Sequence, residues 1–325
     1  MRFLKQCRFL MLVVAAAACG LLALPAQAQE KKALKVSIIP ISDVAPLFAA
    51  IKEGYFKQQG LEIDTAPTAG GAVGIPGLIA GAYDIVFTNV VSTVQAKAQG
   101  LPIKIISPAS AVGDGTQGEE GAGILVRKGE GIKTGADLVG KSLAVNTQKN
   151  IIWLYARAWI QKSGGDPNKV TYREVPFPQM LDALRGKRVD AVFAVDPFLT
   201  IAKADAGLEF IGSPYTAVQP NLSVAQYVVS EDFLAKNPET VRRFNAALHM
   251  GIEWVSKHLG SKELRDLLSS YTKINPELLA KMSPLVDPPR KVDAESIRKT
   301  IALMKAHELL AGDVTPEALL APSAR

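Results

Sequence analysis

The stretch that decides the fold is Gly186–Ala202, GKRVDAVFAVDPFLTIA. A similar stretch occurs earlier, at Gly81–Ala96, GAYDIVFTNVVSTVQA. When Asp84 is aligned with Asp190, the identical pairs Val86/Val192, Phe87/Phe193 and Ala96/Ala202 fall into register. Each copy contains an aspartate, a short apolar run rich in β-branched residues, a polar opening and a helical pattern. This duplication predicts two similar lobes.

The segments around each copy repeat one order of elements. The first copy predicts strands at 34–39, 61–66 and 84–87, a helix at 45–59 and a short helix ending at 80. The second predicts strands at 142–145, 170–175 and 190–195, with helices at 151–162 and 179–184. A β-α-β-α-β order requires parallel strands with right-handed crossovers. The expected class is therefore α/β, with each lobe a mostly parallel sheet flanked by helices.

Two turn-rich connectors, at 108–123 and 213–221, flank the second copy. Further short strands are expected at 124–126, 209–211 and 225–229, and the pattern is helical from residue 231 onward. In the simplest arrangement, the chain passes from lobe 1 into lobe 2, forms that lobe and then crosses back into lobe 1. We expect lobe 1 with a helical tail at 29–120 and 214–325, and lobe 2 at 121–213.

The first 28 residues have the pattern of an export signal. Three basic residues precede an apolar run at 9–24, and Ala26-Gln27-Ala28 is a small-x-small cleavage site. The apolar run is shorter than the roughly 20 residues that a membrane-spanning helix needs. We expect cleavage after Ala28 and a periplasmic location. Lipoprotein processing at Cys19 is the alternative, because Ala16–Cys19 loosely resembles a lipobox.

Removal of this signal changes the global chemistry of the chain. Both cysteines, Cys7 and Cys19, leave with it, so no disulfide, thiolate nucleophile or cysteine metal site is expected. The net charge falls from +6 to +3, since 37 minus 3 basic residues oppose 31 acidic ones. No basic run interleaved with aromatic residues is present, which argues against nucleic-acid binding.

The expected ligand site lies beyond the carboxyl ends of the parallel strands, where helices present free N–H groups. Residues in the loops at these strand ends are Ser42, Asp43, Gly70, Gly71, Asn89, Thr147, Gln148, Lys149, Asn150, Asp196, Pro197 and Phe198. Lys149 and Asn150 open a helix and have the best electrostatic argument for touching an anion. Asp84 and Asp190 lie at strand starts, the opposite end, so we expect a structural role for both.

The chain offers no catalytic constellation in sequence. Its three histidines, His249, His258 and His307, all lie in the helical tail. No HExxH, GxSxG or metal-ligand spacing occurs, and the glycines form neither a Walker loop nor GxGxxG. We therefore expect binding without catalytic residues, metal or cofactor.

Several segments together resemble a known family. Residues Pro46–Ile63, Gly81–Asn89, Ile132–Asn146, Arg188–Phe198 and Glu295–Leu310 resemble the ABC-transporter solute-binding proteins of the nitrate, sulfonate and taurine group, and the thiamine-precursor-binding proteins are similar. The resemblance implies a type 2 periplasmic binding fold whose lobes close by a hinge on a small organic or inorganic anion. It also implies a small-molecule ligand handed to an inner-membrane ABC permease, and we expect a monomer.

The resemblance leaves the ligand and two other functions open. The predicted loops hold no arginine, so Ser42, Thr147 and Asn150 at helix N-termini would hold an anion. Asp43 and Asp196 suit an amine instead, as in a zwitterion. The alternatives are an enzyme resembling the pyrimidine-precursor synthases, which need Cys and His that the mature cleft lacks, and a ligand-sensing module for a membrane kinase.

Overall fold

The computed structural model of the protein describes residues 33–116 and 121–324. The signal expected at residues 1–28, with Cys7 and Cys19, lies outside the described residues. Within the described ranges, no helix combines the length and the apolar character needed to cross a membrane.

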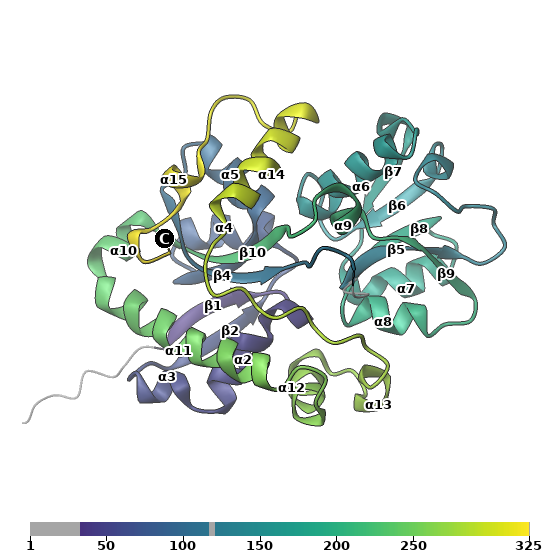
Figure 1. The fold of residues 1–325 in the computed structure, drawn as a ribbon. Helices are drawn as coiled ribbons and strands as arrows, with labels where there is room; N and C mark the ends of the chain where they lie inside the picture. Colours follow the sequence, from purple (N-terminus) through teal and green to yellow (C-terminus); the bar gives the residue numbers. More distant parts are fainter. Residues whose placement is uncertain (1–32, 117–120, 325) are drawn as a thin grey trace, which may run out of the picture. The chain divides into compact units, whose positions relative to one another are not determined.

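Two five-stranded sheets form the framework (Figure 1). The first has the order β2 (Ile63–Pro67), β1 (Leu34–Ile38), β3 (Ile85–Asn89), β10 (Ser223–Ser230) and β4 (Ile103–Ala111). The second has the order β7 (Thr171–Glu174), β6 (Ser142–Val145), β8 (Ala191–Val195), β5 (Ala122–Arg127) and β9 (Leu208–Gly212). In each sheet the first three strands pair in parallel and the fourth is antiparallel to both neighbours. The predicted two-lobed α/β fold is confirmed.

We call the elements around the first sheet lobe 1 and those around the second sheet lobe 2. The expected boundaries at residues 120 and 213 remain a proposal. Helices of lobe 1 are α2 (Ala45–Lys52), α3 (Tyr55–Gln58), α4 (Gly71–Ile79) and α5 (Val90–Ala98). Helices of lobe 2 are α6 (Ile151–Lys162), α7 (Phe177–Arg185) and α8 (Phe198–Lys203), followed by α9 (Pro214–Val218). The tail contains α10 (Glu231–Lys236), α11 (Pro238–Lys257), α12 (Lys262–Thr272), α13 (Pro276–Leu279), α14 (Ala294–Ala306) and α15 (Pro316–Leu319).

Three local predictions were wrong. The helix expected at 45–59 is interrupted because Gly54 adopts a left-handed backbone, with φ of 73°. The connector expected at 108–123 begins inside β4, a strand that the sequence reading missed. Pro108 is tolerated there because β4 lies at the edge of its sheet. The connector expected at 213–221 contains α9, which begins at Pro214.

The repeated aspartates play the same structural part in both lobes. Lys35 N donates to Asp84 Oδ2 at 2.9 Å, and Asp84 N donates to Lys35 O at 2.9 Å. In lobe 2, Ser142 N donates to Asp190 Oδ2 at 2.8 Å, and Asp190 N donates to Ser142 O at 3.0 Å. Each carboxylate thus joins the starts of two neighbouring strands, which agrees with the structural role expected for both residues.

Asp190→Ala is expected to destabilise the fold by about 1–2 kcal/mol, against about 1 kcal/mol for the more exposed Asp84→Ala. Asp190 also accepts from Ser142 Oγ at 2.7 Å and faces Arg127 at 3.5 Å. Burial raises the pKa of Asp190, but the bonds from Ser142 outweigh it, so the pKa is lowered. This stabilisation is therefore present above the unfolded pKa and lost in acid. Urea unfolding at neutral and acidic pH checks both variants; equal effects at neutral pH would contradict the ranking.

The helical tail contacts both lobes. Gly251 of α11 packs against α2 in lobe 1, where a Cβ would lie 2.1 Å from Pro46 O. On α14, Thr300 Oγ1 lies 3.0 Å from the hydroxyl of Tyr155, a residue of α6 in lobe 2. Gln219 Nε2 donates to Ser296 Oγ, also on α14, at 2.9 Å. These buried bonds anchor the tail beside the segments that run between the two sheets.

Candidate functional site

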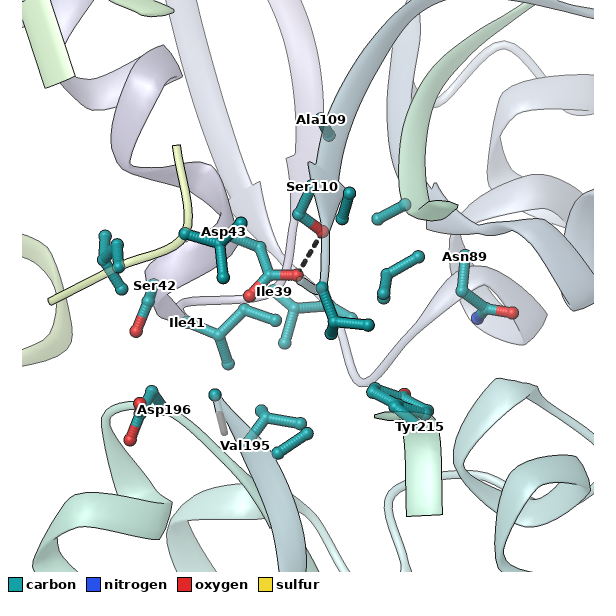
Figure 2. Close-up of a pocket in the computed structure, with 18 of the residues that line it drawn as sticks. Ile39, Ile41, Ser42, Asp43, Asn89, Ala109, Ser110, Val195, Asp196 and Tyr215 are labelled. Carbon is teal, nitrogen blue, oxygen red and sulfur yellow. Dashed lines mark hydrogen bonds between the residues drawn. The ribbon is translucent and has the colours of Figure 1, made fainter. Parts of the chain in front are cut away.

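A cavity of about 110 Å³ lies at the carboxyl ends of β1, β3 and β8 (Figure 2). The ends of β4 and β5 line it as well, and so does a stretch of the tail that contains Ser283 and Pro288. The two sheets and the tail therefore enclose one space. This is the edge at which the parallel strands of an open α/β sheet present their ligand loops.

Part of the predicted site lines this cavity. The lining residues among those predicted are Ser42, Asp43, Asn89, Asn150 and Asp196. Ser42 and Asp43 begin the 3₁₀ turn η1 (Ser42–Val44) after β1, Asn89 ends β3, and Asp196 follows β8. Their contact with a ligand remains a proposal.

The other predicted residues do not line the cavity: Gly70, Gly71, Thr147, Gln148, Lys149, Pro197 and Phe198. A Cβ at Gly71 would lie 1.9 Å from Thr88 Oγ1, so this glycine allows α4 to pack closely on β3. A Cβ at Gly70 would lie 3.3 Å from Asn146 Nδ2, and that nitrogen donates to Ala69 O at 3.0 Å. Gly70 and Thr147 thus belong to a contact between the lobes.

Of three more of these residues, two are held by contacts within their own lobe and the third is exposed. Gln148 N donates to Glu174 Oε1 at 2.7 Å, while Lys149 is exposed with a left-handed backbone, φ 57°. Phe198 stacks on Phe177, with ring centroids 6.4 Å apart, and only Phe177 reaches the cavity. A residue that directly follows the carboxyl end of a strand therefore does not always line the cavity.

Two of the three asparagines in the lining, Asn89 and Asn150, cap helices. Asn89 Oδ1 accepts from Ser92 N at 3.0 Å, and Asn150 Oδ1 accepts from Trp153 N at 3.1 Å. Asn150 Nδ2 donates to Asn146 Oδ1 at 2.7 Å. These caps satisfy N–H groups at the helix N-termini that an anion would otherwise use.

Two carboxyl groups, one from each lobe, line the cavity. Asp43 accepts a short hydrogen bond from Ser110 Oγ, and burial raises its pKa although this bond lowers it. Asp196 is 5% exposed, and its Oδ1 accepts from Thr200 N at 3.1 Å and Thr200 Oγ1 at 2.8 Å. Burial raises the pKa of Asp196 to about 6, against the lowering effect of the Thr200 bonds.

The sequence reading missed several lining residues, including Ser110, Tyr215 and the tail stretch with Ser283. Ser110 was missed because β4 was missed, although the isoleucine-rich stretch at 103–106, IKII, is a strand signal. Tyr215 lies on α9 and packs on Tyr155 and Phe193, each with ring centroids 5.3 Å away. No sequence signal brings the distant tail to the strand ends.

The family model described as "NMT1/THI5 like" matches residues 41–258. The chain belongs to the NMT1/THI5-like family. The matched range begins just after β1 and contains all the other strands of both sheets. It also contains every predicted site residue. The resemblance to ABC-transporter solute-binding proteins that the sequence indicated is confirmed at the level of the family.

Three proteins illustrate the range of similarity. YtlA of Bacillus subtilis is 22% identical over 79% of this chain and 77% of its own length. The alkanesulfonate-binding protein SsuA of Xanthomonas axonopodis pv. citri has a TM-score of 0.73 at 16% identity, with 89% of this chain and 97% of SsuA covered. The periplasmic nitrate-binding protein NrtA of Synechocystis PCC 6803 has a TM-score of 0.74 at 15% identity, with 89% and 85% covered. The two solved structures share the fold of this chain.

In this member of the NMT1/THI5-like family, the described residues that line the cavity include two carboxyl groups and no lysine, arginine or histidine. Most of the remaining wall is apolar, with Ile39, Phe87 and Phe177 among its residues. Over the described ranges, no group of three or more His, Cys, Asp or Glu residues is placed to hold a metal ion. The arrangement can enclose a small molecule and offer it hydrogen-bond acceptors.

Proposed function

We propose that the protein is a periplasmic solute receptor of an ABC importer, which captures a small molecule between its lobes and delivers it to an inner-membrane permease. The observation that carries this proposal is a cavity lined by residues of both lobes and of the tail. A small concave site with apolar walls and few polar groups is typical of ligand pockets. Membership of the NMT1/THI5-like family supports the same function.

Hinge closure is the mechanism that we propose for capture. Two hydrogen bonds join the lobes beside the cavity: Ser42 N donates to Asp196 O at 3.0 Å, and Asn146 Nδ2 donates to Ala69 O at 3.0 Å. A ligand that touches both lobes adds contacts only in the closed arrangement, so its binding shifts the population towards closure. The permease would then recognise the closed form.

The small anion expected from the sequence remains a prediction. The names of SsuA and NrtA, which state alkanesulfonate and nitrate binding, support it. The lining of this cavity opposes a wholly anionic ligand, because Asp43 and Asp196 would repel it and the capping asparagines already occupy helix N–H groups. Ligand class is therefore the property in which this chain is expected to differ from those neighbours.

Thermal unfolding of the exported protein, purified from the periplasm, tests the receptor function. The panel contains alkanesulfonates, taurine, nitrate, pyrimidines, aromatic acids and amines. A true ligand at 100 times its dissociation constant is expected to stabilise the protein by about 2.7 kcal/mol. Small-angle scattering should show a smaller radius of gyration with that ligand. Turnover of a panel compound, with no stabilisation by any of them, would contradict the receptor function.

A further inference from the structure

The carboxyl groups of the cavity retain free hydrogen-bonding capacity. Among the described residues, Asp196 Oδ1 accepts both bonds from Thr200, and Asp43 Oδ2 accepts the bond from Ser110. The structure gives Asp196 Oδ2 and Asp43 Oδ1 no hydrogen-bond donor in this part of the chain. A carboxylate oxygen with open lone pairs can accept a hydrogen bond from a donor that a ligand supplies.

Ser42 adds a third polar group at the same place. Its side chain is 4% exposed, and its Oγ is buried without a hydrogen-bond partner among the described residues. Figure 2 shows this hydroxyl beside Asp196, while the carboxyl group of Asp43 lies on the other side of the Ile41 side chain. A hydroxyl can accept from an N–H group, so Ser42 extends the set of acceptors.

The charge around these groups is negative within the cavity. Asp196 faces Thr200 and Lys203 of α8, the helix that follows it, and Asp43 of η1. Burial raises the pKa of Asp196, the bonds from Thr200 and the charge of Lys203 lower it, and Asp43 raises it further. Lys203 and Lys281 line a separate cavity that shares Asp196 and Ser283 with the first. Among the described residues, no basic residue lines the first cavity itself.

From this arrangement we propose that the transported solute carries a protonated amine on a compact apolar body, with the amine held by Asp196 and Ser42 and the carboxyl group of Asp43 nearby, beyond Ile41. This proposal rests on the receptor function and specifies its ligand. An ammonium group would donate to Ser42 of lobe 1 and to Asp196 of lobe 2, which favours the closed form. The apolar body fits against Ile39, Phe177 and the other apolar walls. No lining residue neutralises an anionic group.

The first experiment compares matched probes by thermal unfolding and calorimetry at pH 7.5. Benzylamine, isopentylamine and piperidine represent protonated amines, benzyl alcohol and benzoate match benzylamine in shape, and taurine and nitrate represent the expected anions. We expect stabilisation by an amine and none by benzyl alcohol, benzoate or nitrate. Stabilisation by an anion or by taurine, without stabilisation by any amine, would overturn the proposal of an amine ligand and leave the receptor function intact. If none of the three amines stabilises the protein, the proposal of an amine ligand is also overturned.

Variants test the assigned side chains. Asp196→Asn is expected to lower the affinity for the bound amine at least about tenfold, because it removes a charge-assisted bond. Asp43→Asn is expected to lower this affinity less, because it removes a nearby carboxyl charge and no bond to the amine. The matched control is Asp232→Asn, which alters an exposed pair with Lys236 on α10 and should leave affinity unchanged. Amine affinity that survives both cavity substitutions would overturn the assignment.

Proton linkage gives an independent readout. The pKa of about 6 for Asp196 means that the group is partly protonated near pH 6. An amine favours the carboxylate and should release protons on binding there, whereas an anion favours the carboxylic acid and should take protons up. Calorimetry near pH 6 in two buffers of different ionisation enthalpy measures the sign. Proton uptake on amine binding would overturn the proposed contact with Asp196.

Discussion

Asp196→Asn is expected to stabilise the ligand-free protein at pH 7.5, by up to about 3 kcal/mol. Burial raises the pKa of Asp196 from 3.8 to about 6, a shift of about two units, and each unit corresponds to about 1.4 kcal/mol. Asparagine has nearly the same shape, carries no charge, and its Oδ1 can still accept both bonds from Thr200. The variant therefore removes the cost of burying a charge while keeping the hydrogen bonds from Thr200.

The pH dependence fixes the sign of this effect. Between about pH 4 and 6 the native state holds a proton on Asp196 that the unfolded state has lost, so wild-type stability falls as pH rises through this window. The advantage of the variant should be largest above pH 7 and vanish near pH 4. Urea unfolding of both proteins across this range measures it, with Asp232→Asn as the exposed control. A variant no more stable than wild type at pH 7.5 would refute the expectation.

A cost in stability is expected for an acidic group that is retained for binding, the role that we propose for Asp196. Asp84 and Asp190 are the contrast within the same chain, because both accept backbone N–H bonds at strand starts. The two kinds of aspartate are therefore distinguished by opposite stability effects on removal. Removing Asp190 should weaken the fold, and neutralising Asp196 should strengthen it.

Gly251→Ala is expected to destabilise lobe 1 by about 3 kcal/mol, a value at the upper end for overpacking. A Cβ at Gly251 would lie 2.1 Å from Pro46 O and 3.0 Å from Ala50 Cβ, so α11 and α2 must move apart. The nearest atom belongs to the backbone of α2 and cannot rotate away. At an exposed position inside a helix, the same substitution would stabilise the protein by about 1 kcal/mol. The sign of the change in unfolding free energy therefore distinguishes a tight contact from an exposed one.

The matched control for Gly251→Ala is His249→Ala, at an exposed position of the same helix. Chemical unfolding monitored by circular dichroism should show a lower midpoint for the glycine variant and little change for the control. Equal midpoints for wild type and Gly251→Ala would contradict the prediction, because they would mean that α11 and α2 can move apart without a loss of stability.

Local patterns in the sequence were sufficient for most of the framework. The strand at 142–145 and the helix at 151–162 were predicted with the bounds that the structure shows. Their periodicities depend on which face of each element is buried, and a short window of sequence contains that information. β4 was missed because Pro108 and its small polar neighbours conceal a strand at the edge of the sheet.

By itself, the sequence determined two lobes of like topology, the family resemblance and the strand ends at which a ligand site forms. Only the tertiary structure decided which side chains from those ends face the cavity. Asn89 and Asn150 face it but cap their own helices, Lys149 remains at the surface, and Asp43 and Asp196 line one space. The physical reason is that the cavity is formed by packing two lobes and a distant tail, and such long-range contacts leave no periodic signal in the chain.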